Sequence, residues 1–172
     1  MANATMTLIA SQVLASTSSS VTFSSIPQTY TDLCFKISAR DSGGGYAGSM
    51  SITFNGDSST NYSVTRLYEI AGSVNITSTT NATSIVASAY PGNTATASSF
   101  GVDDFYIPNY TSTGSRQILD FSASENSSTT LNLLNFGAGL YRGTSAITSV
   151  TFNAAANFAQ YSSFYLYGIK NS

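Results

Sequence analysis

Two stretches of the sequence decide the fold: TFNGDSSTNYSVTRLYEI at residues 53–70 and TFNAAANFAQYSSFYLYGI at residues 151–169. Both read TFN, then a gap, then YSxxxLYxI, and the two gaps differ in length by one residue. Self-similarity of this kind indicates that one structural unit occurs twice in a chain. We therefore predict that the strands beginning at Tyr62 and Tyr161 hold equivalent positions, with these two tyrosines related by a pseudo-two-fold axis.

A weaker similarity lies upstream of both stretches. FSSIPQTYT at 23–31 resembles FYIPNYT at 105–111, and an alternating segment with Leu and Phe two residues apart follows each of them. The prolines of the two copies, Pro27 and Pro108, are expected at equivalent turns or strand edges, where a missing N–H is harmless.

Alternation of apolar and polar residues dominates the rest of the chain, which predicts β-strands. Runs of Gly, Pro, Asn and Ser separate the strands as turns, and the Ser-rich stretches at 16–20 and 77–84 are short enough to be loops. No long stretch has the 3.6-residue period of a helix. The predicted strands cover residues 5–14, 19–24, 30–40, 49–55, 62–70, 83–89, 99–107, 116–124, 129–136, 146–153 and 161–169.

The same alternation predicts which side chains enter the core. Leu33 and Phe35 share one face of their strand, and polar side chains share the other. In RQILDFSAS, residues 116–124, we expect Leu119 and Phe121 to face inward in the same way. Each half of the chain then has an apolar face that it can bury only against the other half.

The composition agrees with strands. Of the 172 residues, 31 are Ser and 22 are Thr, whereas only 8% are charged. Thr, Tyr and Phe fit a pleated surface, and the Lys and Glu that cover helices are scarce. We therefore predict an all-β fold in a single domain over residues 1–172. It is a jelly-roll-like β-sandwich of about 8–11 strands, with half-repeats at approximately 19–70 and 99–169.

The sequence offers little for catalysis. It contains no histidine, which excludes Ser-His-Asp and Cys-His catalysis and zinc sites built on Cys and His. Asp103 and Asp104 are neighbours on a predicted strand, so they should face opposite ways and are poorly placed as a catalytic pair. We therefore predict no catalytic, cofactor-binding or metal-binding residue, and no enzymatic activity.

Carboxylates also bind calcium and catalyse glycoside hydrolysis. Asp57, in the sequence NGDSS, could join a calcium loop, but a polar hairpin turn is the favoured interpretation. A glycosidase would need two of the carboxylates Asp32, Asp41, Asp120 and Glu125, and nothing in their spacing supports it.

Charge and cysteine content limit the partners and the compartment. The formal net charge is -2, and the six basic residues are scattered, so neither a nucleic-acid site nor a basic membrane-binding helix is predicted. Cys34 is the only cysteine and cannot form an internal disulfide. The N-terminus lacks the basic and apolar regions of a signal peptide.

Tyrosine is the residue type that indicates a binding function. Of eleven tyrosines, Tyr46, Tyr90, Tyr110 and Tyr141 lie in predicted loops or strand ends. Tyr combined with Ser, Gly and Asn makes adaptable contact surfaces. We predict that these four contact a partner; the alternative is that they are packing residues on strands.

Several of these motifs resemble those of one group of proteins. The segments VTFSSIPQTYTDLCFKISARDS (21–42), ITFNGDSSTNYSVTRLYE (52–69), FYIPNY (105–110) and FAQYSSFYLYGI (158–169) are similar to short Ser/Thr/Gly-rich virion proteins of tailed bacteriophages, cyanophages among them. Such proteins resemble jelly-roll capsid cement, or decoration, proteins and the head domains of tail fibres. The family carries no catalytic residues, so the resemblance transfers none.

The resemblance implies a role and a location. A cement protein binds the major capsid protein on the capsid exterior, strengthens the shell, and assembles with copies of itself as a trimer or dimer. It is made in the host bacterial cytoplasm and needs no cofactor. The alternative is the receptor-binding domain of a tail fibre or spike, which recognises a host glycan. The chain has no heptads or shaft repeats, which favours the cement protein.

Overall fold

The computed structural model describes residues 5–70, 72–125 and 133–170, and within these ranges every regular element is a strand. The predicted all-β class is therefore confirmed. The strands are β1 (Met6–Val13), β2 (Ser18–Phe23), β3 (Asp32–Ala39), β4 (Ala47–Phe54), β5 (Tyr62–Ile70), β6 (Ser73–Ala82), β7 (Ile85–Pro91), β8 (Gly101–Ile107), β9 (Arg116–Ser124), β10 (Leu133–Tyr141), β11 (Val150–Phe158) and β12 (Ser163–Ile169).

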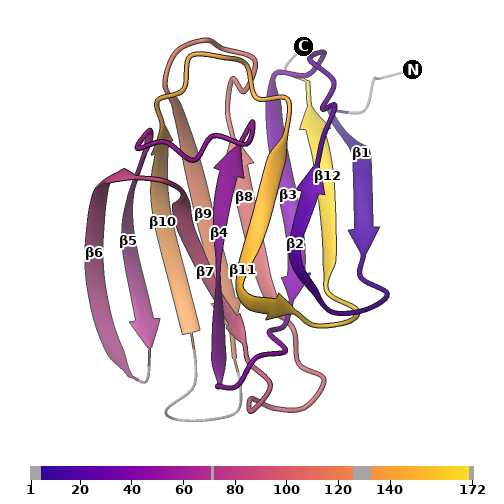
Figure 1. The fold of residues 1–172 in the computed structure, drawn as a ribbon, viewed down its shortest axis with the longest axis vertical. Coiled ribbons are helices and arrows are strands. Elements are labelled where there is room, and N and C mark those ends of the chain that lie inside the picture. The colour runs from indigo at the N-terminus through magenta and orange to yellow at the C-terminus, as the bar shows by residue number, and fades with distance from the viewer. Residues whose placement is uncertain (1–4, 71, 126–132, 171–172) are drawn as a thin grey trace.

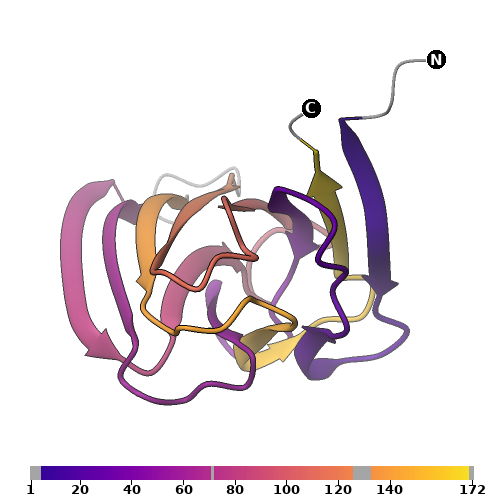
Figure 2. The same ribbon diagram turned by 90° about the horizontal axis from the view of Figure 1, so that it is seen from above.

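The strands form two antiparallel sheets that pack as a β-sandwich. The larger sheet has eight strands in the order β1-β12-β3-β8-β9-β10-β5-β6, and the smaller has four in the order β2-β11-β4-β7. The smaller sheet covers the middle of the larger one, so that β6 and β1 extend beyond it on either side (Figures 1 and 2). Among the residues that the structure describes, no layer covers the other face of the eight-stranded sheet.

The order of the strands is symmetric about the centre of each sheet. In the larger sheet, β5 and β12 lie at the same distance from the centre on opposite sides, as do β6 and β1, and β3 and β10. In the smaller sheet, β4 corresponds in this way to β11 and β7 to β2. The two TFN motifs meet at the centre of the smaller sheet, where Thr53 lies directly opposite Thr151. The strands of the two TFN and YSxxxLYxI copies therefore occupy equivalent places in the fold.

The equivalence does not extend to the side chains of the YSxxxLYxI copies. Tyr62 is fully buried, whereas Tyr161 is 66% exposed in a turn with a φ of 71°. Leu67 is 46% exposed and its sequence counterpart Leu166 is buried. The two strands differ by one residue in the phase of their alternation, and a shift of one residue moves every side chain to the opposite face. The predicted equivalence of Tyr62 and Tyr161 is therefore wrong.

The upstream similarity also fails. Strand β3 is mirrored by β10, not by β9, because β8 and β9 form the central pair of the larger sheet. Pro27 lies in the β2–β3 connection and Pro108 in the β8–β9 connection, which are not mirrored either. Short matches in a chain so rich in Ser, Thr and Tyr arise from composition as well as from structure.

Most strands differ by one or more residues from their predicted bounds, and β11 lies at Val150–Phe158 where 146–153 was expected. The differences at β6 and β10 are the largest. Strand β6 contains residues 77–82, which were predicted as part of a Ser-rich loop, and it brings the number of strands to twelve, above the predicted range. Both of its faces are largely exposed, and apart from Val74 and Ile76 its residues are polar or small, so its sequence gives little alternation to detect. Strand β10 begins at Leu133, and the earlier residues of the predicted strand, 129–132, lie outside the described residues.

The core between the sheets is built on aromatic rings. The rings of Phe35 and Phe152 meet edge to face with centroids 5.1 Å apart, and those of Phe158 and Phe164 meet at 5.0 Å. Phe152 and Phe164 connect the two pairs at 5.7 Å. Each such pair contributes about 0.5–1.5 kcal/mol beyond the burial of its area. This cluster joins β3 and β12 of the larger sheet to β11 of the smaller one.

Candidate interaction face

Three of the four tyrosines predicted to contact a partner lie in the core. Only Tyr46 is exposed. The other three are packing residues whose hydroxyls are used internally: Tyr90 donates to the carbonyl of Ser49, Tyr110 to the carbonyl of Pro27, and Tyr141 to the carboxylate of Asp57. The predicted partner contact is wrong for these three, because a Tyr at a strand end can fold its ring under the neighbouring loop.

Tyr141 belongs to a buried cluster that holds several loops together. Its ring stacks on that of Tyr62 with centroids 4.9 Å apart, and the guanidinium of Arg116 lies 4.9 Å from its centroid. Arg116 is buried and donates to the carbonyls of Ser112 and Ser145. Burial raises the pKa of the Tyr141 hydroxyl. The cluster therefore serves the architecture of the sandwich.

Asp57 organises a polar turn, which is the structure predicted for the sequence NGDSS. Its carboxylate accepts hydrogen bonds from Ser59 N at 2.8 Å, Asn61 Nδ2 at 2.9 Å and Tyr141 Oη at 3.1 Å. Hydrogen bonds, led by those of the Ser59 and Asn61 side chains, lower its pKa from 3.8 to about 2. Among the described residues no group of three or more His, Cys, Asp or Glu side chains is placed to hold a metal ion.

Asp103 and Asp104 face opposite sides of the sheet, as predicted. Asp103 is buried between the sheets, whereas Asp104 forms an ion pair with Lys36 on the outer face, with Nζ and Oδ2 2.5 Å apart. The candidate glycosidase carboxylates make local contacts: Asp32 accepts from Tyr106 Oη, Asp41 from Gly43 N, and Asp120 from Asn135 Nδ2.

Strand β9 presents its apolar side chains to the outside. Leu119 and Phe121 point away from the sandwich, and the polar residues Asp120, Ser122 and Ser124 point into it. The prediction that Leu119 and Phe121 face the core is therefore wrong, although the strand and its alternation are correct. The period of alternation identifies two faces, and it does not say which of them is covered.

Strand β10 has the same inverted arrangement. Leu134 and Phe136 are exposed, whereas Asn135, Gly137 and Gly139 face inward. A Cβ at Gly139 would lie 2.7 Å from Cδ1 of Ile85 in β7. Strand β7 therefore approaches β10 so closely that little room remains for side chains between them.

The exposed apolar side chains of four neighbouring strands form one continuous row. Phe121 in β9 lies directly opposite Phe136 in β10, Phe136 opposite Leu67 in β5, and Leu67 opposite Ile76 in β6. Directly opposite residues share one face of an antiparallel sheet. This row runs without a polar residue from the middle of the larger sheet to its edge.

We define the apolar face as eight side chains that are 42–73% exposed on the outer side of the larger sheet: Leu67, Val74, Ile76, Val102, Leu119, Phe121, Leu134 and Phe136. With about 150–250 Å² for each aromatic side chain and less for each aliphatic one, their exposed fractions correspond to an area on the order of 700 Å². The largest apolar patch of a typical monomer covers roughly 300–600 Å², and each partner in a standard protein interface contributes about 800 Å². The apolar face therefore has the extent of a protein interface.

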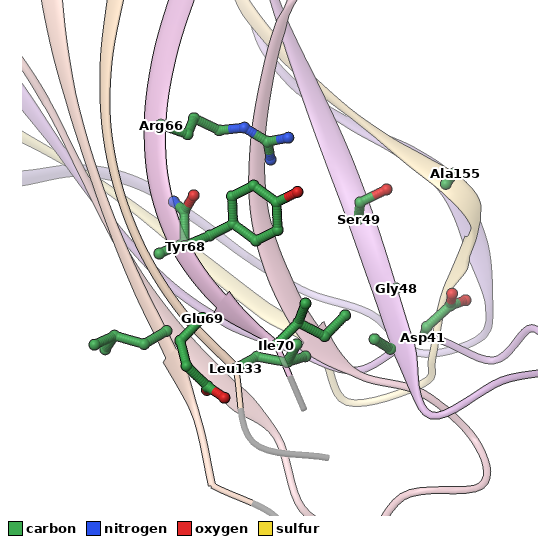
Figure 3. Close-up of a pocket in the computed structure, with 12 residues that line it drawn as sticks. Asp41, Gly48, Ser49, Arg66, Tyr68, Glu69, Ile70, Leu133 and Ala155 are labelled. Carbon is green, nitrogen blue, oxygen red and sulfur yellow. The ribbon is translucent and has the colours of Figure 1, made fainter. Parts of the chain in front are cut away.

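A cleft on the inner side of the larger sheet is the second candidate site. The cleft, with a volume of about 340 Å³, is bordered by β4, β5 and β10. The side chains of Arg66 and Tyr68 extend from β5 toward Ser49 on β4, and Asp41 lies beside β4 farther along the cleft (Figure 3). The guanidinium of Arg66 lies 5.4 Å from the centroid of the Tyr68 ring. The cleft thus combines an aromatic ring with charged groups that bind hydroxyls.

Comparison of the chain with protein-family models, with curated proteins and with solved structures finds no match. The described residues contain no long apolar helix of the kind that crosses a membrane. The apolar face and the cleft are therefore the features from which function has to be argued. Sequence reasoning missed both features. For the apolar face, the available signal was the pairs of apolar residues two positions apart, Leu119 with Phe121 and Leu134 with Phe136.

Proposed function

We propose that this protein is a non-enzymatic structural module that binds a protein surface through the apolar face, and that it serves as a cement protein on the capsid of a tailed bacteriophage. The observation that carries the proposal is the apolar face itself. Burial of about 700 Å² of apolar surface at about 25 cal/mol per Å² is a driving force large enough for stable association. Part of that free energy offsets the entropy lost on binding.

The composition of the apolar face fits a protein partner. Its centre holds two Phe rings and two Leu side chains. Lys36 and Asp104 pair at one border of the face. Glu69 lies between Leu134 and Val74, in the row next to the row of the two Phe rings. Protein interfaces have this pattern of an aromatic and aliphatic centre without charges, surrounded by a polar rim. Under the capsid assignment, the protein partner is the major capsid protein.

The virion assignment rests on the resemblance of the motifs to phage virion proteins of the jelly-roll type. A two-sheet antiparallel sandwich is the architecture that such a module requires. The mechanism is bridging: many copies, each held by one face, connect neighbouring capsid subunits and resist expansion of the shell.

The copy number of the protein in purified virus particles tests the cement role. Quantitative mass spectrometry against the major capsid protein should give copies in proportion to capsid sites. A dozen copies or fewer would contradict it, because so few molecules cannot reinforce a shell.

A matched pair of variants tests the apolar face. Phe136→Ser should reduce retention on particles assembled without the native protein by tenfold or more, because Phe136 lies at the centre of the face. Tyr167→Ser, on the outer side of β12, is the control and should be retained like the wild type. Equal retention of all three proteins would argue against binding through this face.

The cleft supports one alternative, a receptor-binding domain that recognises a host glycan. Tyr68 would stack on the apolar side of a sugar ring, and Arg66 would donate to its hydroxyls. A glycan array tests it, with Tyr68→Ala as the variant and Tyr165→Ala, outside the cleft, as the control. Binding that is lost in the first and kept in the second would favour this function over cement.

A further inference from the structure

Strand β6 forms one edge of the eight-stranded sheet. It pairs with β5 on one side, and no other strand of the described residues pairs with it on the other (Figure 1). Val74 and Ile76 are 72% and 73% exposed, the highest fractions among the exposed large apolar side chains. Both lie on the apolar face, so this face runs without interruption to an open strand edge.

The edge lacks most of the features that prevent strands from pairing between molecules, and its one register shift lies at its end, between Thr79 and Ala82. Natural edge strands carry Lys or Pro, contain bulges, are very short, or are covered by another element. The ten residues of β6, SVNITSTTNA, include no charged residue and no proline. Its pairing with β5 is regular from Val64–Thr79 to Ile70–Ser73.

The opposite edge of the sheet is less suited to pairing. Strand β1 is shorter, at eight residues, and its register shifts between Leu8 and Ala10. A bulge of this kind bends a strand and interrupts the row of backbone groups that a second strand would need. Neither edge is charged, and each contains one register shift. The shift of β6 lies at its end, beyond Thr79, and leaves Ser73 to Thr79 regular, whereas the shift of β1 lies within the strand.

We propose that β6 pairs antiparallel with β6 of a second copy of this chain across a two-fold axis, which joins two eight-stranded sheets into one continuous sheet. An antiparallel strand is complementary to its own copy, because the axis places the N–H groups of each strand opposite the carbonyls of the other. The absence of charge in β6 means that no like charges meet across the axis.

Pairing at this edge doubles the apolar face. The faces of the two copies become continuous, because Val74 and Ile76 lie beside the axis on the same side of the joined sheet. Dimerisation stands independently of the proposed function, whereas the use of a doubled face for shell binding rests on it. Two linked faces would bind a repetitive shell with higher avidity than one.

The test is the same substitution on both edges. Ser78→Lys places a charge near the middle of β6, and Ser11→Lys places one on the exposed side of β1. Sedimentation equilibrium of the purified chains over a concentration series gives the dimer dissociation constant. We expect a dimer for the wild type and for Ser11→Lys, and a dissociation constant at least about tenfold higher for Ser78→Lys, because two lysines then meet across the axis.

Controls separate this loss from misfolding and from other modes of association. Circular dichroism checks that the variants are folded, and Thr80→Lys, exposed on the same strand, replaces Ser78→Lys if that variant does not fold. A monomeric wild type at the highest soluble concentration would overturn the proposal. So would a dimer that Ser78→Lys leaves intact, or one that only Ser11→Lys or Phe136→Ser disrupts. None of these results depends on binding to virus particles, so the failure of one proposal is distinguishable from the failure of the other.

Discussion

The two halves of the eight-stranded sheet have opposite polarity. In β12 and β3, apolar side chains such as Leu166 and Phe35 face the core, and polar side chains such as Lys36 face outward. In β9 and β10 the arrangement is reversed, with Phe121 and Phe136 outside and polar or small residues inside. The same alternation therefore builds a core in one half of the sheet and an exposed apolar face in the other.

The difference follows from what covers each half. Phe152 of β11 and Phe23 of β2 pack on Phe35 at centroid distances of 5.1 and 5.6 Å. The space between the sheets is wide here, and large apolar side chains from the larger sheet fill it. Strand β7 instead approaches β10 closely at Gly139, and glycines and polar side chains occupy most of the inner side of β10 and β9. Asn135 Nδ2 donates to Asp120 Oδ2 at 2.6 Å there. A Phe in place of the inward-facing Gly139 would collide with Ile85 of β7.

The largest expected effect compares one Phe from each half. Phe35→Ala should lower the free energy of unfolding by about 3–5 kcal/mol, because it leaves a cavity in the aromatic cluster. Phe121→Ala, on the outer side of β9, should change it by less than about 0.5 kcal/mol. Urea unfolding monitored by fluorescence measures both. Similar losses in the two variants would mean that the outer face of β9 is covered within the monomer.

A second pair tests the narrow space beneath β7. Gly139→Val should destabilise the fold by about 1–3 kcal/mol, because its Cβ meets Ile85 and the interior has no room for it. Ala138→Val, one residue away on the outer side of β10, should be neutral or slightly stabilising, since β-branched residues suit an open strand surface. Equal stability of the two variants would contradict the close approach of β7 to β10.

The smallest effect concerns the turn that anchors the inverted half through Asp57 and Tyr141. Because the folded pKa of Asp57 is lowered to about 2, its stabilising contribution is complete above the unfolded value of 3.8 and is lost as the pH falls toward 2. The Asp57→Asn variant should lack this part of the acid dependence. The difference in melting temperature between wild type and variant, measured from pH 6 to about pH 2, should shrink as the pH falls. A constant difference would argue against the hydrogen-bonded carboxylate.

The sequence alone determined the all-β class, the position of most strands and the two copies of the TFN and YSxxxLYxI strands. These features depend on local information, because β-branched and aromatic residues with a period of two favour strands wherever they occur. The strand at residues 116–124 was predicted at the bounds that β9 has.

Only the tertiary structure decided which face of each strand is covered. Leu119 and Phe121 were expected inside because alternation shows that two faces differ, and the face that meets another layer depends on β7, which is distant in sequence. Tyr90, Tyr110 and Tyr141 were expected outside because loop positions are usually exposed, but neighbouring segments cover their rings. Strand β6 has little alternation to detect, since hydrogen bonds to β5 form it and no layer of the described residues covers either of its sides. The apolar face arises from these non-local contacts, and for that reason the sequence did not reveal it.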